Sequence, residues 1–154
     1  MTSEAMKTTA VADLMRPVIH SVDHLSSVLS CAKAINHNEA PAVLITSIED
    51  LSQSSENPRI ESGESVIGIV TPGDILRKNV EKCLDPCIEV AESIMASPVI
   101  QIGPENSIRE ALGLMLTRNI QKLVVTSQDN VVLGMITMSD IAVAFLGSAP
   151  AGNE

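Results

Sequence analysis

The stretch Gly68-Ile69-Val70-Thr71-Pro72-Gly73-Asp74-Ile75 decides the fold, because it returns as Gly134-Met135-Ile136-Thr137-Met138-Ser139-Asp140-Ile141. Each copy reads Gly, two apolar residues, Thr, two residues, Asp and Ile, at an offset of 66 residues. Two further pairs of matching blocks lie upstream in the same order. They are 11–15 with 91–95, and 42–46 with 122–126. Three blocks repeated in one order indicate a tandem duplication of a single structural unit.

A helix is predicted early in each copy. Ser107 and Glu110 have the spacing of a capping box, in which hydroxyl and carboxylate satisfy free amides at a helix start. From Ile108 onward, apolar residues recur at helical spacing. In the first copy we expect the matching helix to begin near Ser26 or Ser27.

Strands and a second helix complete the predicted unit. Two short aliphatic runs joined by a polar segment follow each first helix, as expected for paired strands; they are 43–46 and 66–70, then 123–126 and 131–136. Thr71 is placed as the N-cap of the next helix, with Pro72 at its first position and Asp74 at its third. The prediction is an α/β (α+β) fold of two strand-helix-strand-strand-helix repeats. One repeat alone would leave an apolar sheet face open, so we expect them to pack sheet to sheet with pseudo-two-fold symmetry.

The predicted domain boundaries follow the repeat. They are a flexible tail at 1–10, a first repeat at 11–80, a linker at 81–90, a second repeat at 91–146 and a flexible tail at 147–154. The first repeat carries an insertion at 47–65 that is rich in Ser, Glu and Asn. Such a composition buries little apolar surface, so we expect a mobile hairpin loop there.

Charge and composition argue against a nucleic-acid-binding protein. The formal net charge is −9, whereas binding to a nucleic-acid backbone needs clustered Lys and Arg. Phe145 is the only aromatic residue, so no platform exists for stacking bases and the core must be aliphatic. We therefore expect no nucleic-acid partner.

Localisation and chemistry are constrained in the same way. Residues 1–9 are polar and no apolar run is long enough for a membrane span, so we expect a cytoplasmic protein without a membrane partner. Cys83 and Cys87 lack metal-site spacing, and no nucleophile–base pair or phosphate-binding glycine loop is present. Neither a metal site nor catalytic residues are expected.

The motifs resemble those of the CBS domain, named after cystathionine β-synthase, which occurs in tandem pairs called Bateman modules. The resemblance rests on Val11-x-Asp13-Leu14-Met15 and on the two Gly-x-x-Thr-x-x-Asp motifs, and it covers about residues 11–145. It implies a stand-alone regulatory module rather than an enzyme. Such a module binds an adenosine ligand (AMP, ADP, ATP or S-adenosylmethionine) in the cleft between its repeats, forms a homodimer and modulates a separate partner protein.

Carried over to matching positions, the resemblance implies two ligand sites. One combines Thr71 and Asp74 with Ile100, Gln101 and Lys122 from the other half, with Asp74 on the ribose hydroxyls and Lys122 beside a phosphate. The other comprises Thr137, Ser139, Asp140, His20, Ser21, Ala40 and Gln121. A carboxylate can accept hydrogen bonds from both hydroxyls of a ribose, which fits the role given to Asp. Because only the first site includes a cation, we expect the charged nucleotide there.

Two alternatives to a ligand-sensing module stay open, namely a ligand-free scaffold and an enzyme. The Thr and Asp residues of the motifs act as helix caps in any case, so the chain can be a ligand-free scaffold or dimerisation module. Arg77, three residues after Asp74, is expected to form a surface ion pair of small energetic consequence. An enzyme is the least favoured class.

Overall fold

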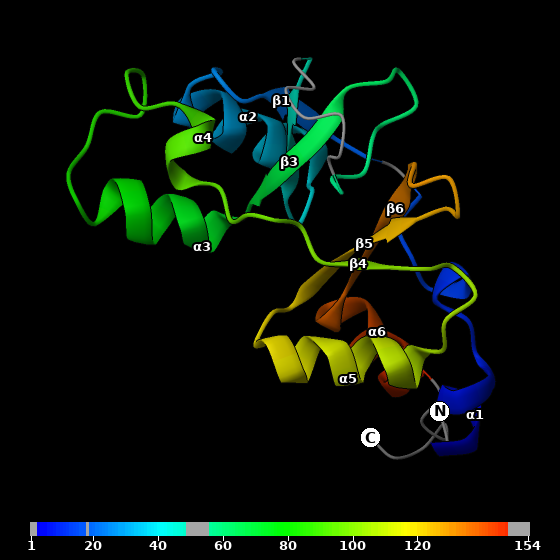
Figure 1. Ribbon diagram of the computed structural model, residues 1–154. Coiled ribbons are helices and arrows are strands. Elements are labelled where there is room, and N and C mark those ends of the chain that lie inside the picture. The colour runs from blue at the N-terminus through cyan, green and yellow to red at the C-terminus, as the bar shows by residue number, and fades with distance from the viewer. Residues whose placement is uncertain (1–2, 18, 49–55, 148–154) are drawn as a thin grey trace. The chain divides into compact units, whose positions relative to one another are not determined.

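The computed structural model describes residues 3–17, 19–48 and 56–147 (Figure 1). The chain divides into two compact units, which do not follow the order of the sequence. Ile19–Val99 forms the first-repeat unit, and Met1–Val18 together with Ile100–Glu154 forms the second-repeat unit. The N-terminal block thus packs with the second repeat, and the block at 91–99 packs with the first.

The first-repeat unit is a three-stranded sheet with helices. Its elements are β1 (Ser21–Asp23), α2 (Val28–Asn38), β2 (Val43–Ser47), β3 (Ser65–Val70), α3 (Pro72–Ile75), the π-helical turn η2 (Leu76–Val80) and α4 (Ala91–Ile94). Strand β2 is central, parallel to β1 and antiparallel to β3. The predicted order of strand, helix, strand, strand, helix is confirmed. Of the predicted insertion, residues 49–55 lie outside the described part of the chain.

The second-repeat unit repeats this topology. Its elements are α1 (Ser3–Thr8), the 3-10 turn η1 (Val11–Asp13), β4 (Gln101–Ile102), α5 (Ile108–Arg118), β5 (Lys122–Thr126), β6 (Val132–Thr137) and α6 (Met138–Gly147). Strand β5 is central, parallel to β4 and antiparallel to β6, and both hairpins carry a bulge at the matching position. Helix α1 lies within the segment expected to be a flexible tail, and residues 148–154 of the other tail fall outside the description.

Each unit has an aliphatic core of its own, as the composition predicts. In the first-repeat unit Val28 and Cys31 of α2 pack against the buried strands β2 and β3 and against Ala91 of α4. In the second-repeat unit Val11 of η1, fully buried, takes the place that Ala91 holds in the first. Complete burial of a side chain such as that of Val11 or Val28 contributes about 1.5–3 kcal/mol. The repeated upstream blocks therefore complete the cores of the two units.

The two long helices start and end alike. Ser27 caps α2 and Ser107 caps α5, each accepting a hydrogen bond from the amide three residues on, at 3.1 Å. The capping box predicted at Ser107 is only half observed, because the Glu110 carboxylate accepts from the side-chain amide of Asn106. Both helices end at a residue in the left-handed region, Glu39 (φ 50°) and Asn119 (φ 54°).

The glycine that opens each motif is a point of close backbone contact. A Cβ on Gly134 would overlap the carbonyl oxygen of Arg16, and one on Gly68 would lie 2.5 Å from Met95 Sδ and 3.0 Å from Ala96 O. Arg16 exchanges two backbone hydrogen bonds with Met135, of 2.7 and 3.0 Å. Ala96 does the same with Ile69. Each upstream block is thereby joined to the strand that carries the motif of its unit.

Candidate functional site

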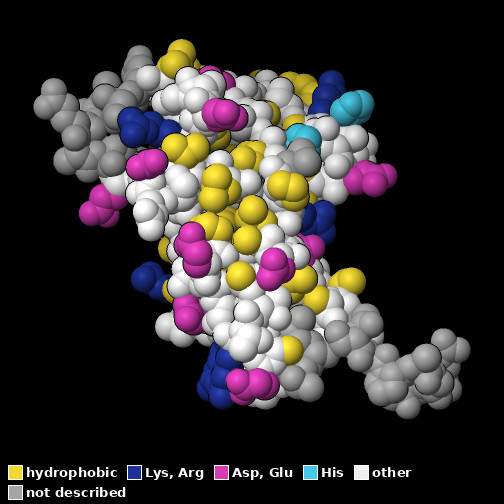
Figure 2. All heavy atoms as spheres, turned by 90° about the vertical axis from the view of Figure 1, so that its right-hand side faces the viewer, with side chains coloured by type: hydrophobic (Ala, Val, Ile, Leu, Met, Phe, Trp, Pro, Cys, Tyr) yellow, Lys and Arg dark blue, Asp and Glu magenta, His cyan; other side chains and the backbone are white. Residues whose placement is uncertain are grey.

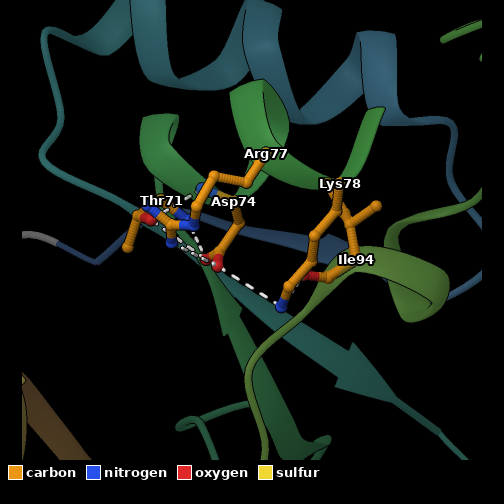
Figure 3. A network of polar contacts seen from close by, with 5 residues as sticks. All are labelled: Thr71, Asp74, Arg77, Lys78 and Ile94. Carbon is orange, nitrogen blue, oxygen red and sulfur yellow. Dashed lines mark hydrogen bonds and ion pairs between the residues drawn. The ribbon is translucent and has the colours of Figure 1, made fainter. Parts of the chain in front are cut away.

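Thr71 and Asp74 form a closed network at the carboxyl end of β3 (Figure 3). The amide of Asp74 donates to Thr71 Oγ1 (3.2 Å), while the amide and hydroxyl of Thr71 donate to Asp74 Oδ2 (2.9 and 3.0 Å). The predicted N-cap at Thr71 is confirmed, and Asp74, which the sequence places at the third helical position, is its reciprocal partner. The Asp74 side chain is only 7% exposed, so its orientation is fixed by these bonds.

Two cations face the other oxygen of the same carboxylate. Arg77 Nη2 and Lys78 Nζ each lie 3.4 Å from Asp74 Oδ1, and Lys78 also donates to the carbonyl of Ile94 (3.0 Å; Figure 3). The predicted surface pair with Arg77 is confirmed, whereas the contribution of Lys78 is new. Both cations are more than a third exposed, so solvent screens these pairs and they add little stability. They give the surroundings of Asp74 a local positive charge.

The second-repeat unit holds a related network at the end of β6. Thr137 Oγ1 accepts from the amide of Asp140 (3.0 Å), and the amide of Thr137 donates to Asp140 Oδ2 (3.1 Å). Arg16 completes it: Nε lies 3.1 and 3.2 Å from the two carboxylate oxygens, and Nη2 lies 3.0 Å from Oδ1. Here the cation comes from the upstream block rather than from the helix that follows the motif.

Sequence reasoning missed Arg16, which is 124 residues from its partner. A signal for it exists in the repeat itself, since Arg16 follows Met15 as Ala96 follows Met95. Each of these blocks pairs with the motif strand of the other sequence repeat, Arg16 with Met135 and Ala96 with Ile69. If each upstream block is known to pair with the motif strand of the other repeat, the sequence places the guanidinium of Arg16 beside Asp140.

The other predicted site residues of the first-repeat unit collect at the same end of its sheet as Thr71. The backbone carbonyl of His20 accepts from the amide of Leu44, Ser21 is the register partner of Leu44, and the amide of Ala40 donates to the carbonyl of Ile35. Because β1 and β2 begin where β3 ends, the register brings His20 and Ser21 to the Thr71 end.

The second-repeat unit shows the same gathering. Lys122 is the register partner of Thr137, and Gln121 O accepts from the amide of Met138. The remaining three lie as follows: Ile100 O accepts from Val124 N, the side chain of Gln101 accepts from Thr126 at 3.1 Å, and Ser139 is exposed in the first turn of α6. Each unit therefore brings together half of each expected site, and the predicted combination of the halves stays a prediction.

Charge and titration add two constraints. On the face drawn in Figure 2, basic side chains of the described residues are interspersed with acidic ones and form no continuous patch. Burial raises the pKa of the Cys31 thiol to about 11, partly offset by a backbone hydrogen bond.

Among the described residues, no group of three or more His, Cys, Asp or Glu side chains is placed to hold a metal ion. The helices of that part of the chain are all too short or too polar to span a bilayer.

Known proteins resemble this chain in sequence and in fold. The CBS domain family matches residues 90–147. An uncharacterized protein of Methanopyrus kandleri is 30% identical over 82 residues, 53% of this chain and 42% of the relative. A homoserine O-acetyltransferase of Methanohalobium evestigatum is 25% identical over 134 residues, 87% of this chain but 24% of the relative. The chain thus spans less than two thirds of the length of the curated relatives it matches.

Solved structures share the whole fold at low identity. A putative signal-transduction protein with CBS domains from Burkholderia ambifaria superposes with a TM-score of 0.76 at 20% identity, over 95% of this chain and all of the other. The CBS domain pair of protein MJ0100, in complex with 5′-methylthioadenosine and S-adenosyl-L-methionine, gives 0.70 at 20% identity, over 92% and 98%. CBS domains are generally regulatory rather than catalytic. Residues 90–147 match the CBS domain family, residues 68–75 repeat the motif found within that segment, and the fold of the whole chain is shared with a solved protein with CBS domains.

Proposed function

We propose that this chain is a ligand-sensing regulatory module whose motif carboxylates, Asp74 and Asp140, bind the ribose of an adenosine ligand. The observation that carries the proposal is the repeated Thr–Asp network. In both units a largely buried carboxylate is oriented by a capping Thr at the same end of the sheet and lies beside a cation. A carboxylate held in this way can accept from the two hydroxyls of a ribose, and a neighbouring cation suits a phosphate.

The nature of the ligand follows from the same residues. We propose an adenosine nucleotide (AMP, ADP or ATP) or S-adenosylmethionine, a choice supported by the adenosine compounds bound to the CBS pair of MJ0100. Lys78 and Arg77 flank Asp74, so we assign the more anionic ligand to the first-repeat unit. Binding would favour one of two conformations of the module and so act on a separate partner protein.

Calorimetric titration of the purified protein with AMP, ATP and S-adenosylmethionine tests this proposal. Asp74→Asn and Asp140→Asn keep the size of the side chain but remove the charge that accepts the ribose hydroxyls. We expect each substitution to remove binding at its own unit, so that one site remains. Asp129→Asn, in the exposed turn between β5 and β6, makes the same change of charge and should leave binding intact. Equal affinity of all three variants for every ligand would refute the site assignment.

A ligand-free scaffold is the second candidate, favoured by one specific observation. The capping networks are complete as they stand: Thr71 and Thr137 satisfy their amides and both carboxylates have partners. In that case the motifs are helix caps alone, contributing about 1 kcal/mol each. A thermal-shift screen separates the two functions, since a scaffold would show no change in melting temperature with any adenosine compound.

Self-association is part of the proposal. Exposed apolar side chains lie on α5 and α6 of the second-repeat unit, namely Leu116, Val143, Phe145 and Leu146. Helices α5 and α6 pack against each other, and large exposed apolar side chains on packed helices favour burial by a partner. We propose a second copy of the chain as that partner, giving a homodimer.

A further inference from the structure

The guanidinium of Arg16 lies across both oxygens of the Asp140 carboxylate, which is the group proposed to bind the ribose. An ionised carboxylate offers about four acceptor positions on its two oxygens. Oδ2 accepts from the amide of Thr137 (3.1 Å), the single Nε–H of Arg16 is shared between Oδ2 (3.2 Å) and Oδ1 (3.1 Å), and Arg16 Nη2 forms an ion pair with Oδ1 at 3.0 Å. Three of these four contacts come from Arg16. Two ribose hydroxyls can therefore bind Asp140 only if Arg16 withdraws.

The backbone of Arg16 is held in place by hydrogen bonds, whereas its side chain is half-exposed and has room to move. Its amide and carbonyl both pair with Met135, and the missing side chain of Gly134 permits that approach. The Arg16 side chain is 47% exposed, whereas that of Asp140 is 15% exposed. Rotation about side-chain bonds can thus carry the guanidinium away from Asp140 without disturbing β6.

From this arrangement we infer that Arg16 is a latch on Asp140 that sets the ligand specificity of the second-repeat unit. A ligand with a vicinal diol displaces the guanidinium from the carboxylate. A ligand that also carries a phosphate gives Arg16 a new bidentate acceptor, because guanidinium geometry matches phosphate as well as carboxylate. A neutral nucleoside displaces the guanidinium from Asp140 but offers no negative group to replace the lost ion pair. The unit therefore selects anionic adenosine ligands over neutral ones. This inference rests on the proposed function and names the residue that selects among its ligands.

The first-repeat unit lacks this latch. The position that matches Arg16 is Ala96, and the cations near Asp74 belong to the helical turn after the motif. They approach only one of its oxygens, at 3.4 Å. In the second-repeat unit, the difference in affinity between adenosine and AMP should therefore depend on Arg16. In the first-repeat unit it should not.

The test is a comparison of adenosine and AMP by calorimetry in an Asp74→Asn background, where only the second-repeat unit binds. Arg16→Ala removes the competitor of a neutral ligand and the partner of a phosphate. We expect AMP to bind about tenfold more weakly and adenosine several-fold more tightly, so that the preference for AMP falls by more than tenfold. Arg109→Ala, on the exposed side of α5, removes the same charge and should preserve the preference.

An NMR measurement on protein with Arg16 intact tests the inference without relying on the folding of the Arg16→Ala variant. In the Asp74→Asn protein with Arg16 intact, the Nε–H signal of Arg16 in a nitrogen-edited NMR spectrum should exchange slowly with water. Adenosine should broaden it, and AMP should move it to a new sharp position. Binding of both ligands with an unchanged Arg16 signal and an unchanged preference in Arg16→Ala would overturn the latch and leave the proposed function standing. Absence of binding by either ligand in the unsubstituted protein would overturn both.

Discussion

Substituting the motif glycines with alanine compares two equivalent positions that have different neighbours. At Gly134 the new methyl group overlaps the backbone carbonyl oxygen of Arg16 and lies 3.1 Å from its carbonyl carbon. At Gly68 the shortest approach, 2.5 Å, is to Met95 Sδ, the flexible end of a side chain, and the backbone is reached only at 3.0 Å. Rotation of Met95 relieves most of the second clash, whereas only a shift of the backbone relieves the first.

The expected magnitudes follow from these contacts. Overpacking costs about 1–3 kcal/mol, and moving the Arg16 segment weakens its two backbone hydrogen bonds with Met135, each contributing about 1 kcal/mol. We expect Gly134→Ala to lower the free energy of unfolding by about 3–4 kcal/mol and Gly68→Ala by about 1 kcal/mol. The restriction of the unfolded chain by alanine, about 0.4–1 kcal/mol, is common to both and cancels in the difference.

Urea denaturation followed by far-ultraviolet circular dichroism measures this difference, since the chain has no Trp or Tyr for fluorescence. With a denaturant slope of about 1–3 kcal/mol per molar, the two midpoints should differ by about 1–2 M. Gly113→Ala in α5 meets no atom within 4 Å and should instead stabilise the protein by about 0.5–1 kcal/mol. Stabilities of Gly134→Ala and Gly68→Ala within about 0.5 kcal/mol of each other would refute the reasoning.

Four further predictions concern helix capping, thiol reactivity, the pH dependence of stability, and assembly. Glu39→Gly should raise the free energy of unfolding by about 1 kcal/mol, because Glu39 ends α2 in the left-handed region; a lower melting temperature would contradict this. Cys83 and Cys87 are exposed and should react with a thiol reagent at pH 8, whereas the buried thiol of Cys31 should react only after unfolding; three equally fast thiols would be the contrary result. The pKa of Cys31 is raised from 9.0 to about 11, so the unfolded chain binds fewer protons between these values and stability falls as pH rises through them. Light scattering should give the mass of a dimer, and Leu146→Glu, which places a charge on the exposed surface of α6, should give a monomer; an unchanged mass would place the interface elsewhere.

Sequence patterns predict the local features of this fold well, because those features depend on neighbouring residues. The N-caps at Ser27, Ser107 and Thr71 and the order of the strands follow from spacings of a few residues. Contacts between distant blocks are a different matter. The pairing of Arg16 with Asp140 depends on which unit the upstream block joins, and no local spacing encodes that choice.

The candidate site shows the same division. The roles of Thr71 and Asp74 as reciprocal caps follow from their spacing, and so does the ion pair with Arg77. Lys78 lies four residues after Asp74, so its ion pair is also a local contact that the spacing could have predicted, whereas its hydrogen bond to the carbonyl of Ile94, 16 residues away, has no local signal.

The exchange of upstream blocks bears on how this protein can be cut. A fragment of residues 19–99 is continuous and contains every residue of one core, so it is a reasonable candidate for expression alone. A fragment that follows the family match, 90–147, would lose Val11 from its core and the segment that pairs with β6, while carrying the residues of α4 that belong elsewhere. Duplication copied one stretch of sequence, whereas each compact unit with a core of its own combines its repeat with the upstream block of the other.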